Sequence, residues 1–277
     1  MSIFRTFVAF LGIAGCFALS GCALAENYDD PNGPRYAGSY STDHELPFDD
    51  VTVVTFNVEF GEHVSRAVSE LREHEELSRA GVLLLQEMDP DGVDAMAREL
   101  GYDYVYYPGS VHHGKDFGNA VLSRWAIESD EKLVLPHRNP TNGRIRIAVG
   151  ATLATPSGPF AVFSVHSDTL WLGPRARLEQ ARAVIDAAER SAPPVVVGGD
   201  FNTLEAAMVE ETAGEFEQAG YEWATAEVPP STANALGEAK LDHVFVKGLV
   251  VLGASTQATR ASDHQPVWVT LERVASP

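Results

Sequence analysis

The sequence contains almost no cysteine. Of its 277 residues only two are cysteines, Cys16 and Cys22, and both lie close to the N-terminus. The chain from residue 23 onward therefore has no thiol, which excludes a disulfide framework, a zinc site built on Cys and His, and a cysteine nucleophile. No Gly-x-Ser-x-Gly motif is present either, so no nucleophilic serine of that kind is indicated.

Positive charge is also scarce. Against 39 Asp and Glu residues the chain has 20 Lys and Arg, which gives a formal net charge of -19. Binding to duplex nucleic acid depends on Lys and Arg side chains that neutralise backbone phosphates, so tight binding of duplex DNA is not expected. A local basic patch or a bridging metal would still permit nuclease activity. The hydrophobic fraction of 45% suffices for one large domain with a substantial core. We expect the protein to be a monomer.

The first 22 residues resemble an export signal. Residues 6–19 form a nearly unbroken apolar run, too short for a span of roughly 30 Å, which needs about 20 residues, but typical of a secretory signal peptide. The sequence Leu19-Ser20-Gly21-Cys22 resembles a bacterial lipobox. We therefore expect residues 1–21 to be a lipoprotein signal peptide and Cys22 to be the acylated N-terminus of the mature chain. An ordinary signal peptide cleaved near Ala23 to Ala25 is the alternative.

The predicted anchor places the protein in the cell envelope, because two or more acyl chains hold a protein stably on a membrane. Ala23 follows Cys22 directly. An Asp at that position often retains lipoproteins at the inner membrane, and Ala23 is not an Asp. The outer membrane is thus the expected destination in a Gram-negative cell, and the outer face of the cell membrane otherwise. Residues 22–50 are rich in Asp, Gly, Pro, Ser and Tyr and lack apolar periodicity, which predicts a flexible tether. The folded domain is expected over residues 51–277.

Strand-like and helix-like segments alternate from Val51 onward. Periodicity predicts helices over residues 63–79, 92–100 and 174–190, the last beginning at Pro174, which is tolerated in a first helical turn. Short β-branched or apolar runs predict strands over residues 51–58, 82–86, 102–107, 119–123, 132–135, 145–153, 160–166, 195–198, 241–246, 249–252 and 265–272. Strands outnumber helices but mix with them throughout, which favours an α/β fold of two packed sheets covered by helices.

Polar side chains of the kind that bind hard divalent cations recur at the ends of these strands. Single polar residues after strands are usually helix caps or turn residues. Here six sites each adjoin an apolar strand, which caps alone do not explain: Thr-Phe-Asn ending at Asn57, Leu-Gln-Glu ending at Glu87, Val-His ending at His166, Gly-Gly-Asp-Phe-Asn over 198–202, Leu-Asp-His over 241–243 and Ser-Asp-His over 262–264.

These motifs, with Gly-Asn-Ala-Val-Leu-Ser over residues 118–123, resemble in order the endonuclease/exonuclease/phosphatase superfamily, a group that includes deoxyribonuclease I-like metal-dependent hydrolases. The resemblance covers residues 51 to about 272, nearly the whole predicted domain. It implies a four-layer α/β/β/α sandwich of two mostly antiparallel, mixed sheets flanked by helices, with the active site at one edge of the paired sheets.

The resemblance also implies a metal site. Asn57 and Glu87 match the family's principal metal ligands, and Asp263 lies close to the same ion. Mg²⁺ is the expected cofactor, because it prefers oxygen ligands and keeps several waters; Mn²⁺ is a possible substitute.

Five further residues match catalytic positions of the family. Asp200 matches the carboxylate that positions or deprotonates the attacking water, and Asn202 the amide that steadies phosphoryl oxygens. His264 matches the histidine beside the scissile phosphate, with Asp242 as the carboxylate that orients it. His166 matches a second histidine found in the deoxyribonuclease I and sphingomyelinase branches. Abasic endonucleases have a tyrosine in that role, so His166 argues against that branch.

Several other polar residues near these motifs are not expected to take part directly in catalysis. Asn119 borders the implied site, whereas Arg146 is expected on a solvated or salt-bridged strand face. His112 and His113 are expected to be solvated in a polar loop, and Glu59 is a candidate for a second ligand shell.

The expected activity is that of an exported, metal-dependent phosphoesterase that hydrolyses phosphodiesters by in-line attack of water. The substrate is expected to be nucleic acid or a phospholipid-type head group. A phosphomonoesterase, a sphingomyelinase-type lipid phosphodiesterase and a catalytically silent surface lipoprotein are the alternatives. Expected partners are the phosphoester substrate and, through the lipid anchor, the membrane.

Overall fold

The computed structural model describes residues 25–192, 194–234 and 237–273. The predicted signal peptide, residues 1–21, and the predicted lipidation site Cys22 lie outside the described residues. Within the described part of the chain, no helix is both long enough and apolar enough to cross a membrane.

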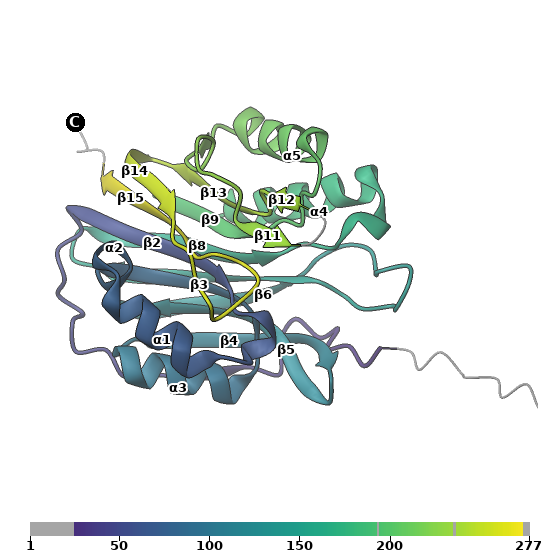
Figure 1. Cartoon of the computed structure of the whole chain (residues 1–277). Helices are drawn as coiled ribbons and strands as arrows, with labels where there is room; N and C mark the ends of the chain where they lie inside the picture. Colours follow the sequence, from purple (N-terminus) through teal and green to yellow (C-terminus); the bar gives the residue numbers. More distant parts are fainter. Residues whose placement is uncertain (1–24, 193, 235–236, 274–277) are drawn as a thin grey trace, which may run out of the picture.

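A seven-stranded sheet forms one half of the molecule (Figure 1). Its strands run in the order β1 (Tyr36–Gly38), β4 (Asp103–His112), β5 (Lys115–Ser123), β3 (Ala80–Met88), β2 (Asp50–Asn57), β15 (Val267–Arg273) and β14 (Leu249–Thr256). Neighbours are antiparallel except β2 and β3, which are parallel. Parallel neighbours end at the same edge of a sheet, so the ends of β2 and β3 lie side by side.

A six-stranded sheet forms the other half. Its strands run in the order β10 (Glu222–Trp223), β13 (Asp242–Lys247), β9 (Val195–Asp200), β8 (Gly158–His166), β7 (Ile147–Thr155) and β6 (Ala126–Val134). Only β8 and β9 are parallel. A two-stranded ribbon of β11 (Thr232–Asn234) and β12 (Gly237–Ala239) adjoins the start of β13.

Helices cover the outer face of each sheet (Figure 1). On the seven-stranded sheet lie α1 (Val64–Glu73), α2 (Glu75–Ser78) and α3 (Pro90–Leu100), and on the six-stranded sheet α4 (Pro174–Ala188) and α5 (Ala206–Gln218). The two sheets pack face to face around a third apolar cluster. The expected four-layer α/β/β/α sandwich is therefore confirmed.

Strand alternation builds the three apolar layers. Along β2, Val53 faces the cluster between the sheets and Val54 the cluster under the helices. Along β9, Val196 points between the sheets and Val197 toward α4 and α5. Successive side chains of a strand point to opposite faces, and a strand covered on both faces reads as a continuous apolar run. This explains why these strands were recognisable in the sequence as a β-branched run over residues 51–58 and an apolar run over residues 195–198.

The flexible tether was predicted over residues 22–50, but its described part, residues 25–50, packs onto the seven-stranded sheet. β1 pairs with β4, and Phe48 is buried between the two sheets beside Trp125. The Tyr28 hydroxyl donates to Asp116 at 2.6 Å. These anchors are single aromatic residues spaced far apart, so they produce no periodicity that a sequence reading detects.

Two helices also differ from the sequence prediction. The helix expected over residues 63–79 is interrupted at His74, whose backbone is extended, and this residue separates α1 from α2. Helix α5 was not predicted, because it buries only Thr212, Ala213 and Phe216 and its other residues are mostly Ala and Glu.

Candidate active site

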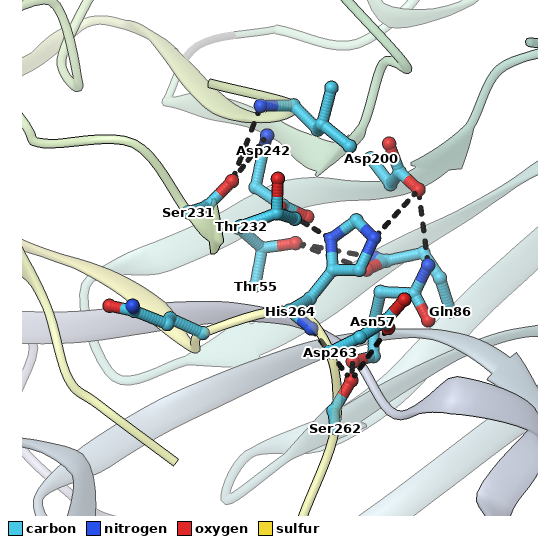
Figure 2. A network of polar contacts seen from close by, with 12 residues as sticks. Thr55, Asn57, Gln86, Asp200, Ser231, Thr232, Asp242, Ser262, Asp263 and His264 are labelled. Atoms are coloured by element: carbon cyan, nitrogen blue, oxygen red, sulfur yellow. Dashed lines mark hydrogen bonds and ion pairs between the residues drawn. The ribbon is translucent and has the colours of Figure 1, made fainter. Parts of the chain in front are cut away.

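The polar strand ends meet at one edge of the sandwich. Asn57 ends β2, His166 ends β8 and Asp200 ends β9, while Asp242 begins β13 directly opposite Asp200. The two sheets are joined here by a hydrogen bond from the Asn57 amide to Asp200 Oδ2 at 3.0 Å. His264 comes from the loop before β15 and completes the cluster (Figure 2).

The His264 ring lies between two carboxylates, as Figure 2 shows. Its Nδ1 is 2.8 Å from Asp242 Oδ2, and its Nε2 is 3.8 Å from Asp200 Oδ2. Burial disfavours the charged ring, but Asp242 and Asp200 outweigh it and raise the pKa of His264 to about 10. His264 is therefore an imidazolium at neutral pH, with Nδ1–H donating to Asp242 and Nε2–H directed toward the site.

Asp200 is buried and lies between the two histidines. Its Oδ1 accepts the Asn202 backbone N–H at 2.8 Å, and its Oδ2 faces Asn57, His166 and His264. Burial raises the pKa of Asp200 above its ordinary value, and the His264 imidazolium opposes that rise. A carboxylate with a raised pKa is a better proton acceptor near neutral pH than an ordinary aspartate.

His166 is buried and neutral, whereas His264 is positively charged. Its Nε2 lies 3.5 Å from Asp200 Oδ2 and 3.8 Å from Glu87 Oε1. Burial, followed by the positive charge of Arg146 and His264, lowers the pKa of His166 well below its ordinary value. Arg146 Nη1 is 3.2 Å from His166 Nδ1. Because a guanidinium can only donate, Nδ1 accepts and the neutral ring carries its proton on Nε2, facing the carboxylates.

The implied metal ligands lie on the side of the seven-stranded sheet. Glu87 has a positive φ of 59°, and burial raises the pKa of its carboxyl group, opposed by Arg146 and Asn57. The Asn57 side-chain oxygen accepts the Glu59 backbone N–H at 3.1 Å. Asp263 is exposed, and its backbone N–H donates to Glu59 Oε2 at 3.1 Å. Glu59 thus joins Asn57 to Asp263.

These residues fit a divalent cation on chemical grounds. Glu87 and Asp263 offer carboxylate oxygens and Asn57 an amide oxygen, the donors that Mg²⁺ prefers. A cation would also offset the cost of burying the ionised Glu87. Asp200, Asp242 and His264 form a second group whose potential ligand atoms lie within 4.8 Å of one another. In that second group, His264 Nδ1 already forms a hydrogen bond with Asp242. The oxygen donors of Glu87, Asp263 and Asn57 therefore suit a hard cation better.

Most of the residues singled out from the sequence meet in this cluster. Asn57, His166, Asp200, Asp242 and His264 are joined by direct contacts of 3.8 Å or less. Two residues lie at its margin: Asp263 is solvent-exposed, and the Asn202 side chain donates to the Ser167 carbonyl at 3.1 Å. Asn119 is buried and donates to the backbone of β7 and β8, so it joins the two sheets beneath the site.

Arg146 forms a salt bridge, which was one of its two expected surroundings, whereas His112 is less solvated than expected. Arg146 lies 3.9 Å from the buried Asp168 and also contacts His166. Its proximity to His166 arises because the next residue, Ile147, pairs with His166 across β7 and β8. His112 stacks on His113 with ring centroids 4.2 Å apart, and burial lowers the pKa of His112 to about 4. His113 itself is exposed, as expected.

Gln86 and Asp168 were missed by the sequence reading. Gln86 Nε2 donates to Ser164 Oγ at 3.0 Å and to the Leu84 carbonyl at 3.1 Å, joining β3 to β8 under the site. Asp168 is buried and accepts from Asn139 at 2.7 Å. The signal was present: both adjoin motif residues, in Leu-Gln-Glu and Val-His-Ser-Asp.

Comparisons with known proteins agree with the fold and the motifs. The sequence model of the Endonuclease/Exonuclease/phosphatase family matches residues 54–264. A UPF0294 protein of Vibrio vulnificus (strain YJ016) is 32% identical over 112 residues, which cover 39% of this chain and 38% of the relative. The match thus spans less than half of that relative's length.

Solved structures share the fold at low sequence identity. An endonuclease/exonuclease/phosphatase from Beutenbergia cavernae has a TM-score of 0.69 and 20% identity, covering 83% of this chain and 73% of that one. The mannosyl-6-phosphatase Bt3783 of Bacteroides thetaiotaomicron has a TM-score of 0.64 and 20% identity, covering 80% of this chain and 99% of that one.

Proposed function

This chain belongs to the endonuclease/exonuclease/phosphatase family, and on that basis we propose that it hydrolyses phosphodiester bonds by direct in-line attack of water. The observation that carries the proposal is the position of Asp200. Its Oδ2 faces the neutral His166 and the imidazolium His264 at 3.5 and 3.8 Å. A proton acceptor and two proton donors therefore surround the space where a phosphoryl group would bind.

Each group has a defined part in the proposed reaction. Asp200 accepts the proton of the attacking water, a contribution of about 10²- to 10⁴-fold in rate for well-placed general bases. His264, held by Asp242, donates from Nε2 to a phosphoryl oxygen or to the departing oxygen. His166 donates from Nε2 to a second phosphoryl oxygen, with Arg146 fixing its tautomer. Asn202 is assigned to steadying the phosphoryl group from the margin.

Glu87, Asn57 and Asp263 are the proposed ligands of Mg²⁺, with Mn²⁺ as an alternative. A bound divalent cation would supply positive charge to the phosphoryl oxygens as negative charge develops on them. Glu87 is the ligand on which binding depends most, because its buried carboxylate carries the largest desolvation cost without a cation.

The proposal is tested with bis(p-nitrophenyl) phosphate. We expect the protein to release p-nitrophenol with Mg²⁺ or Mn²⁺ and to stop when EDTA is added in excess. Release that continues unchanged after chelation contradicts a metal-dependent site. No release with either ion contradicts the phosphodiesterase itself.

A phosphomonoesterase is the second candidate, favoured by the fold shared with a mannosyl-6-phosphatase. The two candidates differ in the charge of the bound group, since a monoester carries up to one more negative charge than a diester. Turnover of p-nitrophenyl phosphate at a rate above that of the diester would favour the monoesterase.

We further propose that the protein is exported and held on a membrane through acylated Cys22. The described chain enters the domain at the catalytic edge, where Val111 N–H donates to the Glu26 carbonyl at 2.8 Å. Four residues span at most about 14 Å, so an anchor at Cys22 would hold this edge close to the bilayer. Fatty-acid labelling that is lost in Cys22→Ser would support the anchor, and equal labelling of both proteins would exclude it.

A further inference from the structure

A small cavity of about 140 Å³ opens beside Glu87 at the catalytic edge. Four of its lining residues carry flat rings: Phe60, His112, His113 and Phe117. None of these rings has a part in the proposed hydrolysis.

The four rings form one continuous aromatic wall. Phe60 lies 4.8 Å from His112, 5.2 Å from His113 and 5.6 Å from Phe117, measured between ring centroids. Phe117 in turn lies 5.8 Å from His166. The wall therefore runs from the catalytic histidine outward to the hairpin between β4 and β5.

The backbone around this cavity is strained. Glu59, Phe60, Glu87 and His113 have φ values of 42°, 57°, 59° and 49°, a region that residues with side chains rarely adopt. A bulky residue such as Phe60 is especially unfavourable there. Strain of this kind persists where the surrounding structure enforces it and is concentrated at binding and catalytic sites. Here it holds two of the rings, Phe60 and His113, on the cavity wall.

Positive charge flanks the wall on its catalytic side. The Arg146 guanidinium lies 5.7 Å from the centre of the Phe117 ring. Arg144 stands two residues before Arg146 in the sequence, and burial and then the charge of Arg146 lower the pKa of Arg144. The buried Arg144 Nε has no hydrogen-bond partner among the described residues. The cavity itself is also lined by Glu62, Glu87, Lys115 and Asp116. Because guanidinium groups attract an anion, a phosphate suits the side of Arg146, and an uncharged flat group suits the ring wall beside it.

We propose that Phe60, His112, His113 and Phe117 form a ring-binding subsite that stacks an unpaired nucleobase carried by one arm of the phosphodiester. Bases stack on aromatic side chains with little sequence preference, whereas the bases of a duplex are already stacked and paired. The substrate class is therefore a nucleotide diester at a strand end or in single-stranded nucleic acid. The assignment of a diester as substrate rests on the proposed phosphodiesterase activity, whereas the binding of a base to the four rings does not.

Two diesters with the same leaving group test the subsite. Thymidine 5′-(p-nitrophenyl) phosphate carries a base and methyl p-nitrophenyl phosphate does not. We expect the wild-type protein to prefer the thymidine diester in kcat/KM, chiefly through KM. In Phe60→Leu, which keeps apolar volume but removes the ring, that preference should fall at least about fivefold. Phe60→Trp should retain the preference.

Val250→Ala is the matched control, because Val250 is exposed on β14 and lies away from the cavity; it should leave the preference unchanged. No preference in the wild-type protein, or equal losses on both diesters in Phe60→Leu, would overturn the subsite. Hydrolysis of phosphatidylcholine vesicles without any base preference would assign the site to a lipid head group instead.

Binding separates failure of the subsite from failure of the activity. If neither diester is hydrolysed, the proposed phosphodiesterase is wrong, and the subsite is tested by equilibrium dialysis of thymidine 5′-monophosphate against 2-deoxyribose 5-phosphate. Tighter binding of the nucleotide that is lost in Phe60→Leu supports the subsite. Equal binding of the two phosphates contradicts it.

Discussion

The catalytic edge has two halves that are built differently. One half consists of Asp200 and Asp242 from the six-stranded sheet and His264 from the loop before β15; it is buried and internally paired, and its charges hold one another in place. The half contributed by the seven-stranded sheet, with Glu87 and Asp263, is more open, and Glu87 sits on strained backbone.

This contrast indicates a division of labour. A preorganised pair such as Asp242 and His264 needs no ligand to keep its geometry, which is what proton transfer requires. In the other half, Arg146 opposes but does not cancel the effect of burial on Glu87, so a bound cation would stabilise that carboxylate and the other oxygen donors further. We infer that the first half performs proton transfer and the second binds the cation, so damage to each should have a different signature.

Removing the central carboxylate should have the largest effect. Asp200→Asn abolishes the proton acceptor while keeping nearly the same volume, so kcat/KM for bis(p-nitrophenyl) phosphate should fall by about 10²- to 10⁴-fold. Thermal unfolding should show that the variant remains folded. Activity within a few-fold of wild type would remove Asp200 from the chemistry.

The second prediction distinguishes the two halves directly. Glu87→Gln should shift the Mg²⁺ concentration needed for half-maximal activity upward by about 10- to 100-fold. Asp242→Asn, its counterpart in the other half, should lower kcat and leave that concentration nearly unchanged. If both variants shift the Mg²⁺ requirement equally, the two halves are not separate and the buried Asp200, Asp242 and His264 group becomes the better metal site.

The smallest predicted effect concerns stability beneath the paired half. His243 is buried on β13, 2.7 Å from the Thr203 hydroxyl, and burial lowers its pKa to about 3. In the unfolded chain a histidine has a pKa of about 6.5, so below that pH the unfolded state binds a proton that the folded state does not. His243 therefore has no effect above about pH 6.5 and costs about 1.4 kcal/mol of stability for each pH unit below it.

Chemical unfolding of the wild-type protein and His243→Gln at pH 7 and about pH 5.5 measures this contribution. The wild-type protein should lose about 1.4 kcal/mol more than the variant on acidification. His112 and His166 contribute the same slope to both proteins, so they cancel in the difference. Equal losses would mean that His243 is not the source.

Asp200, Asp242 and His264 could be predicted from the sequence more completely than the residues around them. Each of the three lies beside an apolar strand, so one local pattern indicates both the strand and the functional residue. Arg146 reaches His166 only through the pairing of β7 with β8, which no local pattern encodes. The ring contacts of Phe60 with His112 and Phe117 join residues more than 50 positions apart.

Residues 26–50 illustrate the same limit for the fold. Phe48 is buried between the sheets and Tyr28 bonds to Asp116, yet the segment between them has no repeating apolar pattern. This segment is held in place by isolated contacts with strands that are distant in the sequence. Its amino-acid composition resembles that of a linker, so composition alone does not reveal these contacts.

Mg²⁺ titration of EDTA-treated protein, followed by calorimetry and by hydrolysis of bis(p-nitrophenyl) phosphate, tests the division of labour most directly. Wild-type protein should bind the ion and regain activity over the same concentration range. Asp200→Asn should bind Mg²⁺ with an affinity close to that of wild type and remain inactive, whereas Glu87→Gln should bind it weakly and regain activity only at high concentration. An Asp200→Asn variant that regains full activity, or a Glu87→Gln variant with unchanged Mg²⁺ affinity, would contradict the account.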